Sequence, residues 1–345
     1  MKHNRICIVA LVFLCLIPAT LFAQRGRGSS QGNTIEIKIA SPVPENSLWG
    51  TSLNRIAAEW TRISGGQIRV RVLHGGTEGG EAKMLSSLDT NQIQAAVFTT
   101  FGLSAINPAI LTVSCPFLIR NDAELDLVLR EVQGDFEARI NDSTDYVMIA
   151  WSKAGWVNIF SRDPVFVPDD LRRMRLATNS EAGGLNTVFK TMGFQLVETD
   201  IVDVAAKMAS GTITAVYQSP AAVAAYRLYI TLRNMASINI APFLGGIVMN
   251  KVTWEKIDPR HREEMLRATR RIAAELDASM QRTVDNSITV MSQLGLTINR
   301  LSAEQEQLWT SEIGKAVPGL LGTTFDRGIY QKIDAILRQH RGGQP

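Results

Sequence analysis

The stretch from Pro259 to Gly295 reads PRHREEMLRATRRIAAELDASMQRTVDNSITVMSQLG. Apolar residues recur in it every three or four positions, at Met265, Ala268, Ile272, Leu276, Met280, Val284, Ile288 and Met291. This spacing places them on one face of an α-helix, which would approach a length of about 50 Å. A single lobe of a chain this size does not need so long a helix. We therefore expect one helix that runs along two lobes and ties them together; the alternative is two shorter helices with an unmarked break.

Upstream of this helix, strand and helix patterns alternate in two successive β-α-β-α-β units. In the first unit Ile35, Ile37 and Ile39 alternate with polar residues, which is the period of a strand. The expected segments of this unit are strands at 34–41, 67–76 and 93–100, with helices at 48–64 and 78–92. The second unit begins near residue 150, with strands at 146–161, 174–179, 194–200 and 213–220 and helices at 182–193 and 202–211. This order predicts an α/β fold with a largely parallel sheet in two lobes and a cleft between them.

The lobes exchange chain segments in this prediction. Lobe I comprises residues 34–152 plus 245–283, and lobe II comprises residues 153–244 plus 284–338. Two terminal helices are expected at Glu304–Lys315 and Gly328–Arg338, followed by a polar tail at 339–345.

The first 23 residues, MKHNRICIVALVFLCLIPATLFA, combine a short basic start with an apolar run from Ile6 to Ile17. This arrangement is typical of a secretory signal peptide cleaved after Ala23. The run is shorter than the roughly 20 apolar residues of a membrane-spanning helix. An uncleaved anchor and a lipid-modified Cys15 are the alternatives. Residues 24–33 are polar and rich in glycine and serine, as expected of a flexible leader.

Charge and cysteine content exclude several classes of protein. The 36 basic and 33 acidic residues give a formal charge of +3, and Lys2 and Arg5 fall in the signal peptide. Without those two charges the mature chain would stand near +1, too weak a bias to favour nucleic acid or an anionic membrane. Cys115 is the one cysteine outside the signal peptide, so we expect no internal disulfide and a buried, inert thiol.

Motifs of known catalytic chemistry are missing from the sequence. It contains no G-x-S-x-G, no H-E-x-x-H and no Walker loop, and no Cys/His spacing suited to zinc. The expected mature chain holds the histidines His74, His261 and His340, and none of them lies beside a recognisable nucleophile. We expect no catalytic residue, metal or cofactor; an exported hydrolase with an unrecognised site is the alternative.

Six segments in the same order resemble the solute-binding proteins of tripartite ATP-independent periplasmic (TRAP) transporters, the DctP family. They are IEIKIAS (35–41), EWTRISGGQIRVRVLHGGTEGGE (59–81), CPFLI (115–119), DDLRRMRLATNS (169–180), MGFQLVETDIVDVAAKMASGTITAVYQSP (192–220) and IVMNKVTWEKIDPRHREEMLRAT (247–269). The resemblance implies a two-lobed periplasmic binding protein-like fold, with a long helix spanning both lobes. It also implies a small-molecule ligand and a separate membrane permease driven by an ion gradient.

The resemblance further implies an arginine that binds the carboxylate of an organic acid, and it assigns this role to Arg175. In the expected strand Arg175 lies on the opposite face from Met174 and Leu176. Its planar guanidinium suits a carboxylate, and an arginine in an apolar strand is costly unless it is paired or faces a wet cleft. An internal ion pair with Asp200 or Asp203 is the alternative. Arg172 and Arg173 precede the strand, where we expect them in solvent.

Other positions depart from the family pattern. Val157 stands where many members carry a second ligand arginine, with Trp156 beside it, and Ile201 stands at a position that is often aromatic. Gln218 and Ser219 replace an acid and an asparagine.

Together with Phe243, these residues predict a more apolar cleft with a single positive group, Arg175. Glu81 follows two glycines and is expected either to cap the helix that begins there or to accept a hydrogen bond from the ligand.

We therefore expect a periplasmic solute-binding protein that captures an organic acid, a monocarboxylate with an apolar portion, and delivers it to a TRAP permease. The alternative is an uncharged hydrophobic ligand, with a dedicated periplasmic partner protein. No nucleic acid is expected as a partner.

Overall fold

The computed structural model describes residues 34–178 and 183–342. The expected signal peptide at 1–23 and leader at 24–33 lie outside these ranges. Within the described ranges, no helix combines the length and apolar character needed to cross a membrane.

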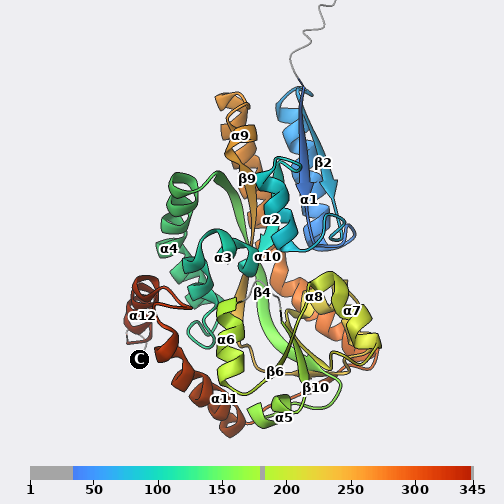
Figure 1. Cartoon of the computed structure of the whole chain (residues 1–345), viewed down its shortest axis with the longest axis vertical. Helices are drawn as coiled ribbons and strands as arrows, with labels where there is room; N and C mark the ends of the chain where they lie inside the picture. Colours follow the sequence, from blue (N-terminus) through green and yellow to red (C-terminus); the bar gives the residue numbers. More distant parts are fainter. Residues whose placement is uncertain (1–33, 179–182, 343–345) are drawn as a thin grey trace, which may run out of the picture. The chain divides into compact units, whose positions relative to one another are not determined.

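Strands and helices alternate as the sequence predicts (Figure 1). The strands are β1 (Ile35–Ala40), β2 (Ile68–Leu73), β3 (Ala95–Thr99), β4 (Tyr146–Ser161), β5 (Arg175–Thr178), β6 (Gln195–Glu198), β7 (Ala215–Gln218), β8 (Asn234–Ala236), β9 (Ala241–Asn250) and β10 (Thr297–Asn299). The α-helices are α1 (Leu48–Ile63), α2 (Glu81–Asp89), α3 (Thr100–Ile106), α4 (Asp122–Ser143), α5 (Pro168–Arg172), α6 (Gly183–Thr191), α7 (Ile201–Ala209), α8 (Pro220–Ala225), α9 (Lys251–Trp254), α10 (Pro259–Gln293), α11 (Ala303–Ala316) and α12 (Arg327–Gly342). Short 3-10 helices are η1 (Pro108–Ser114), η2 (Leu228–Ile230) and η3 (Val317–Leu320).

The sheet consists of two parallel groups joined by two antiparallel strands. Its order is β2-β1-β3-β9-β4-β7-β5-β6, and β8 pairs with β4 and β10. We call β2, β1 and β3 the first half-sheet and β7, β5 and β6 the second. Strands pair in parallel within each half-sheet, whereas β9 and β4 run antiparallel to their neighbours in this order. The expected largely parallel sheet is thus found in each half, with β9 and β4 between them.

The long helix α10 is a single unbroken helix of 35 residues, as its periodicity predicts. It begins with Pro259 at its first position, where a proline loses no helical hydrogen bond, and Asp258 caps it by accepting from the Arg260 N–H at 2.9 Å. On one side it packs against α1, where Trp60 Nε1 donates to Thr269 Oγ1 at 2.8 Å. Further along it packs against β4 and α8. The helix therefore contacts elements that belong to both halves of the sheet.

Strand β4 contains a bulge where it passes between the two half-sheets. Its pairing with β9 shifts register between Lys153 and Gly155, so Ala154 is an extra residue, and Gly155 adopts a φ of +88° that favours glycine. Beside the bulge, Lys153 donates its backbone N–H to Asp277 Oδ1 of α10 at 2.7 Å. A carboxylate from the long helix thus holds the strand at its irregular point.

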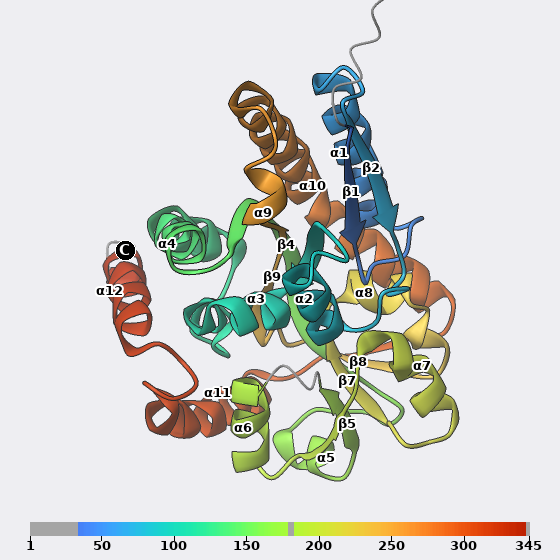
Figure 2. The same ribbon diagram turned by 45° about the horizontal axis from the view of Figure 1, so that its top comes forward.

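The two terminal helices pack on different parts of the molecule. Helix α11 contacts α6, and Trp309 Nε1 of α11 donates to the Phe166 carbonyl oxygen at 3.0 Å. Helix α12 instead packs against α4 and η1, beside α4 in Figures 1 and 2. The sequence prediction grouped 327–338 with lobe II, yet α12 packs on residues expected in lobe I. The expected tail also begins too early, because α12 continues to Gly342.

Asp277 is half-buried, and burial raises the pKa of its carboxyl to about 6. The Lys153 N–H, the Lys153 ammonium and the Ser152 hydroxyl oppose this shift, whereas the Asp126 carboxylate adds to it. An acid whose pKa is raised in the folded state holds its proton longer in the folded than in the unfolded chain. Its contribution to stability is present below the ordinary aspartate pKa and is lost as the pH rises through about 6.

We predict that Asp277→Asn removes this pH dependence, because asparagine still accepts the Lys153 N–H but carries no charge. The Tm of the variant minus that of the wild type should increase between about pH 4 and pH 7. Differential scanning calorimetry across this range measures it. A difference in Tm that does not change with pH would contradict the assignment.

Candidate functional site

A cavity of about 140 Å³ lies between the two half-sheets, under the β4 bulge. An apolar cavity of similar size in another protein binds benzene, so the space fits a compact solute. The first half-sheet, β9 and their loops contribute Pro42, Val43, Pro44, Trp49, Gly79, Gly80, Glu81, Val97, Phe98, Thr99, Phe101, Phe243, Leu244 and Gly245. The second half-sheet and its helices contribute Ala177, Thr178, Leu185, Phe189, Thr199, Asp200, Ile201, Val202, Val204, Val216, Tyr217, Gln218, Ser219, Ala222, Ala225 and Tyr226, and β4 contributes Ala154.

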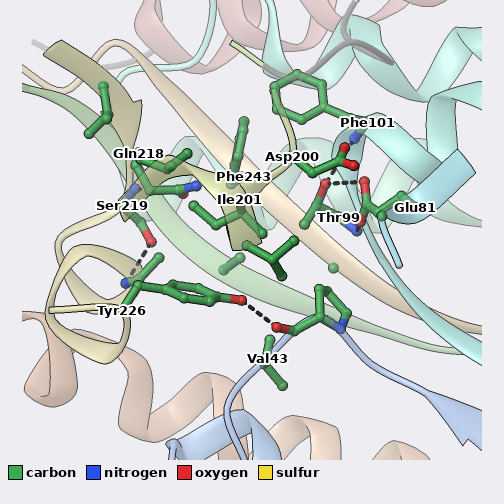
Figure 3. A pocket seen from close by; sticks show the side chains of 18 of the residues that line it. Val43, Glu81, Thr99, Phe101, Asp200, Ile201, Gln218, Ser219, Tyr226 and Phe243 are labelled. Atoms are coloured by element: carbon green, nitrogen blue, oxygen red, sulfur yellow. Dashed lines mark hydrogen bonds between the residues drawn. The ribbon is translucent and has the colours of Figure 1, made fainter. Parts of the chain in front are cut away.

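The polar groups of the cavity lie at the carboxyl ends of parallel strands. Thr99 ends β3, Thr178 ends β5 and Gln218 ends β7, while Asp200 lies two residues beyond β6. Ligands of open α/β sheets bind outside these strand ends, because the loops that leave them diverge there. Figure 3 shows Asp200, Glu81 and Thr99 at one side of the cavity and Gln218, Ser219 and Tyr226 at the other.

Glu81 is the first residue of α2, but its carboxylate accepts hydrogen bonds from the N-terminus of the next helix, α3. It is 5% exposed and accepts hydrogen bonds from Thr99 N at 2.5 Å, from Thr99 Oγ1 at 3.0 Å and from Gly102 N at 3.0 Å. These donors surround the N-terminus of α3, where backbone N–H groups lack helical partners and favour a negative charge. Glu81 therefore lies at the wall of the cavity and fixes α3 against α2.

On the opposite wall, Ser219 caps α8 by accepting from Ala222 N at 3.3 Å, and Gln218 Oε1 accepts from Ser219 N at 2.9 Å. Tyr226, which comes directly after α8, donates its hydroxyl to the Pro42 carbonyl oxygen at 2.5 Å. Burial raises the pKa of Tyr226, so this phenol remains a donor at neutral pH. The bond joins the loop after β1 to the helix after β7 across the mouth of the cavity.

Two glycines in the loop between β2 and α2 allow this loop to approach the start of α7. A Cβ added at Gly76 would lie 2.4 Å from Val202 Cγ1, and one added at Gly80 would lie 2.3 Å from Asp200 Oδ2. Contacts this short do not occur, so a side chain at either position would require the Val202 or the Asp200 side chain to shift from its observed place. The two halves of the cavity therefore meet through Gly76, Gly80 and Tyr226.

The charged residues among the described lining are Glu81 and Asp200, and none of those residues is a lysine, arginine or histidine. The stretch 179–182, between Thr178 and Leu185, lies outside the description and contains no basic residue in the sequence. The described wall thus offers hydrogen-bond acceptors, neutral hydroxyl donors and apolar surface but no fixed positive charge.

Five of the eight residues that the sequence singled out line this cavity. They are Glu81, Ile201, Gln218, Ser219 and Phe243. Their contact with a ligand remains a prediction, but their common location agrees with it.

The structure does not place Arg175 in the lining of this cavity, so its role toward a ligand stays a prediction. Arg175 is the first residue of β5 and is exposed, whereas the cavity lies at the carboxyl end of that strand, at Ala177 and Thr178. Its guanidinium donates to the carbonyl oxygens of Thr212, at 2.9 Å, and Gly211. The alternative ion pair with Asp200 or Asp203 is also absent from the described residues. Side-chain alternation predicts the face of β5 on which Arg175 lies, but it does not tell which end of the strand borders the cavity.

Trp156 and Val157 also lie outside this cavity. Val157 is fully buried in the core. Trp156 lines a separate cavity of about 380 Å³ between β4 and α10, and its Nε1 donates to Asp122 Oδ1 at 2.9 Å. The bulge is the physical cause, because one extra residue changes the faces to which successive side chains point, and Ala154 lines the ligand cavity.

Sequence reasoning missed Thr178, Tyr217 and Tyr226, and it considered Asp200 only as a partner of Arg175. The position of Thr178 and Asp200 at the ends of predicted parallel strands was a usable signal. Tyr226 gave no such signal, since its role depends on the approach of Pro42 from a distant loop.

The family model for bacterial extracellular solute-binding proteins, family 7 (DctP), matches residues 39–319. The 2,3-diketo-L-gulonate-binding periplasmic protein YiaO of Escherichia coli K12 is 22% identical over 206 residues, which cover 58% of this chain. The match spans only 61% of the length of that relative.

Solved structures of TRAP periplasmic solute-binding proteins share the fold. The protein from Ralstonia eutropha H16 with bound (S)-2-acetolactate has a TM-score of 0.82 at 19% identity, covering 88% of this chain and 99% of its own. The Sulfurospirillum deleyianum protein with bound succinate has a TM-score of 0.81 at 16% identity, with the same coverage. The Xanthobacter autotrophicus protein with bound β-D-galacturonate has a TM-score of 0.78 at 14% identity, covering 87% and 99%.

These similarities confirm the two-lobed α/β fold, and the family consists of periplasmic transport components without enzymatic activity. The chain belongs to the DctP family of bacterial extracellular solute-binding proteins, the solute-binding components of TRAP transporters.

Proposed function

We propose that this protein captures a compact, largely apolar solute that carries no carboxylate, and delivers it to a TRAP membrane permease. The carrying observation is the cavity between the half-sheets, whose described lining includes no lysine, arginine or histidine. The proposal selects the alternative ligand from the sequence analysis, because Arg175, the expected carboxylate anchor, lies elsewhere.

Electrostatics supports this choice. Moving a carboxylate from water into a cavity is costly unless a cation or several donors receive it. Glu81 and Asp200 already line this cavity, and a third negative group would be repelled more strongly there than in water. A neutral solute meets neither cost, and a cation loses its hydration but is attracted by these carboxylates.

An organic acid is the second candidate, since the related structures were solved with succinate, acetolactate and galacturonate bound. Such a ligand would depend on neutral donors of this cavity, for example the Thr178 or Tyr217 hydroxyl. If this candidate is correct, simple carboxylates bind to the protein, whereas the first proposal expects that they do not.

We also propose export through the N-terminal signal segment and delivery to permease subunits, as the membership of the family suggests. In this arrangement the protein binds its solute outside the cytoplasmic membrane, and a periplasmic partner protein is an additional candidate. No sequence feature favours nucleic acid.

The lobes are proposed to divide at residues 152 and 153 of β4, next to the bulge, with α12 assigned to the lobe that contains α4. The two lobes would close by bending at this point, where Gly155 has unusual backbone freedom. Closure would form the contacts of Gly76 with Val202 and of Gly80 with Asp200.

We predict that Gly76→Ala holds the lobes apart, because its new methyl group would overlap Val202. Gly75→Ala is a matched control: Gly75 and Gly76 have φ of +68° and +70°, so both variants strain the backbone, but a Cβ at Gly75 meets nothing within 4 Å. Small-angle X-ray scattering should give a larger radius of gyration for Gly76→Ala than for Gly75→Ala. Equal radii would argue against this contact as a condition of closure.

The ligand class is tested by thermal shift and mass spectrometry. Succinate, galacturonate and pantoate should leave the Tm of the wild type unchanged, since a bound ligand would raise it. Native mass spectrometry of the gently purified protein should find any retained molecule to be neutral or cationic. Arg175→Ala should bind the same molecule as the wild type. Stabilisation by a carboxylate that Arg175→Ala abolishes would restore the original assignment and refute this proposal.

A further inference from the structure

Asp200 occupies the N-cap position of α7 without capping the helix. Its backbone is extended, with φ −74° and ψ 151°, as an N-cap requires, but its side chain makes no capping hydrogen bond. Aspartate is among the residues most favoured at this position because its carboxylate normally accepts from the first turn. The carboxylate here is therefore directed to something other than its own helix.

The Asp200 carboxylate instead lies against Gly80, which precedes α2, on the side of the cavity that also carries Glu81 and Thr99 (Figure 3). A side chain at position 80 would require this carboxylate to shift, and Asp200 lines the cavity. Among the described residues it has neither an ion pair nor a side-chain hydrogen bond. Lys207, further along α7, donates to Thr199 Oγ1 at 2.7 Å rather than pairing with Asp200. Among the described residues, the Asp200 carboxylate is thus left with only the favourable dipole of α7 beside it and has no side-chain partner.

Thr178 provides a second, independent indication of a ligand at this end of the cavity. It is 8% exposed, lines the cavity, and its Oγ1 has no hydrogen-bond partner among the described residues. Thr199 N donates to the Thr178 carbonyl oxygen at 2.8 Å, which places the ends of β5 and β6 side by side. A buried hydroxyl without a partner costs free energy that a bound polar group would recover.

The remainder of the cavity is suited to an apolar body. Phe101 and Phe243 pack edge to face at 5.0 Å between ring centroids, Phe243 and Tyr217 at 6.1 Å, and Tyr217 and Phe189 at 5.2 Å. These four rings all line the cavity. Aromatic faces also attract a cation that lies over them, so the wall is compatible with an ammonium as well as with a neutral solute.

We propose that Asp200 is the specificity-determining residue of this cavity and accepts a hydrogen bond from an amine or hydroxyl group of the solute. This rests on the proposed function, a compact apolar solute without a carboxylate. Thr178 pairs with the same polar group, whose N–H or O–H it accepts. The body of the solute lies against the aromatic residues. Acids are excluded, and apolar molecules with a donor are preferred over those without one.

Four probes that share one apolar body test the proposal: benzylamine, benzyl alcohol, toluene and benzoate. Isothermal titration calorimetry with the full mature chain should show the amine or the alcohol binding about tenfold or more tightly than toluene. Benzoate should bind most weakly. If benzylamine binds more tightly than benzyl alcohol, Asp200 recognises the positive charge; if the two affinities are equal, it recognises only the hydrogen-bond donor.

Asp200→Asn has nearly the same shape but loses the charge, and Asp203→Asn on the exposed side of the same helix is the matched control. Asp200→Asn should reduce the preference for benzylamine over toluene to near unity and leave toluene affinity unchanged. Asp203→Asn should change neither. Equal Tm values for the two variants separate this effect from a loss of folding.

Each outcome has a distinct meaning. If toluene binds the wild type as tightly as the donors, or if Asp200→Asn weakens toluene and benzylamine alike, the role of Asp200 is refuted while the apolar cavity stands. Tightest binding of benzoate refutes both the role of Asp200 and the proposed function. Failure of all four probes to bind at millimolar concentration refutes the proposed function itself.

Discussion

The hydrogen bond from Lys153 N to Asp277 Oδ1 secures the point on which the rest of the molecule depends. Strand β4 pairs with β9 and with β7, and the bulge at Ala154 is one of two places where its pairing with β9 shifts register. A bulge bends a strand and increases its twist, so β4 changes direction between the two half-sheets, and the cavity lies between residues of both. By accepting this N–H, α10 joins the bend to a helix that packs on both sides. The same extra residue places Ala154 in the wall of the cavity.

Once the half-sheets are oriented in this way, the residues at the end of each strand determine the chemistry of the cavity. Parallel strands bring their carboxyl ends together, and in this chain those ends carry Thr99, Thr178 and Asp200 beside Glu81. Glu81 is occupied by the N-terminus of α3, so its charge is already compensated by backbone dipoles. Asp200 lies at the N-terminus of α7, whose dipole also favours a negative charge, but its carboxylate accepts no capping hydrogen bond there. The two carboxylates that line the cavity therefore differ in their hydrogen bonding, and we propose that Asp200 is the one available to a solute.

The sequence could predict features that depend on local periodicity, and it failed where tertiary geometry decides. The 35-residue helix was predictable because its apolar stripe continues without interruption. Arg175 lies outside the cavity lining because alternation along a short strand cannot tell which end meets a cavity. Trp156 and Val157 lie outside it because a bulge shifts the alternation by one residue. Glu81 was correctly placed at the start of a helix, α2. Its carboxylate, however, stabilises the start of α3, which lies next to Glu81 only in the folded chain.

The related structures share this fold at 14–19% identity while holding acidic ligands, so the fold alone does not determine the solute. In this chain the backbone supplies the cavity, and a bulge, glycines and helix caps shape its walls. Selectivity depends on a few side chains at strand ends, which can change without disturbing the sheet. In this chain those side chains are acidic or neutral, and the arginine nearest in sequence, Arg175, is held by two backbone carbonyl oxygens about 10 Å along the strand from Thr178. The side chains at the strand ends therefore bear on the choice of solute more directly than the shared fold does.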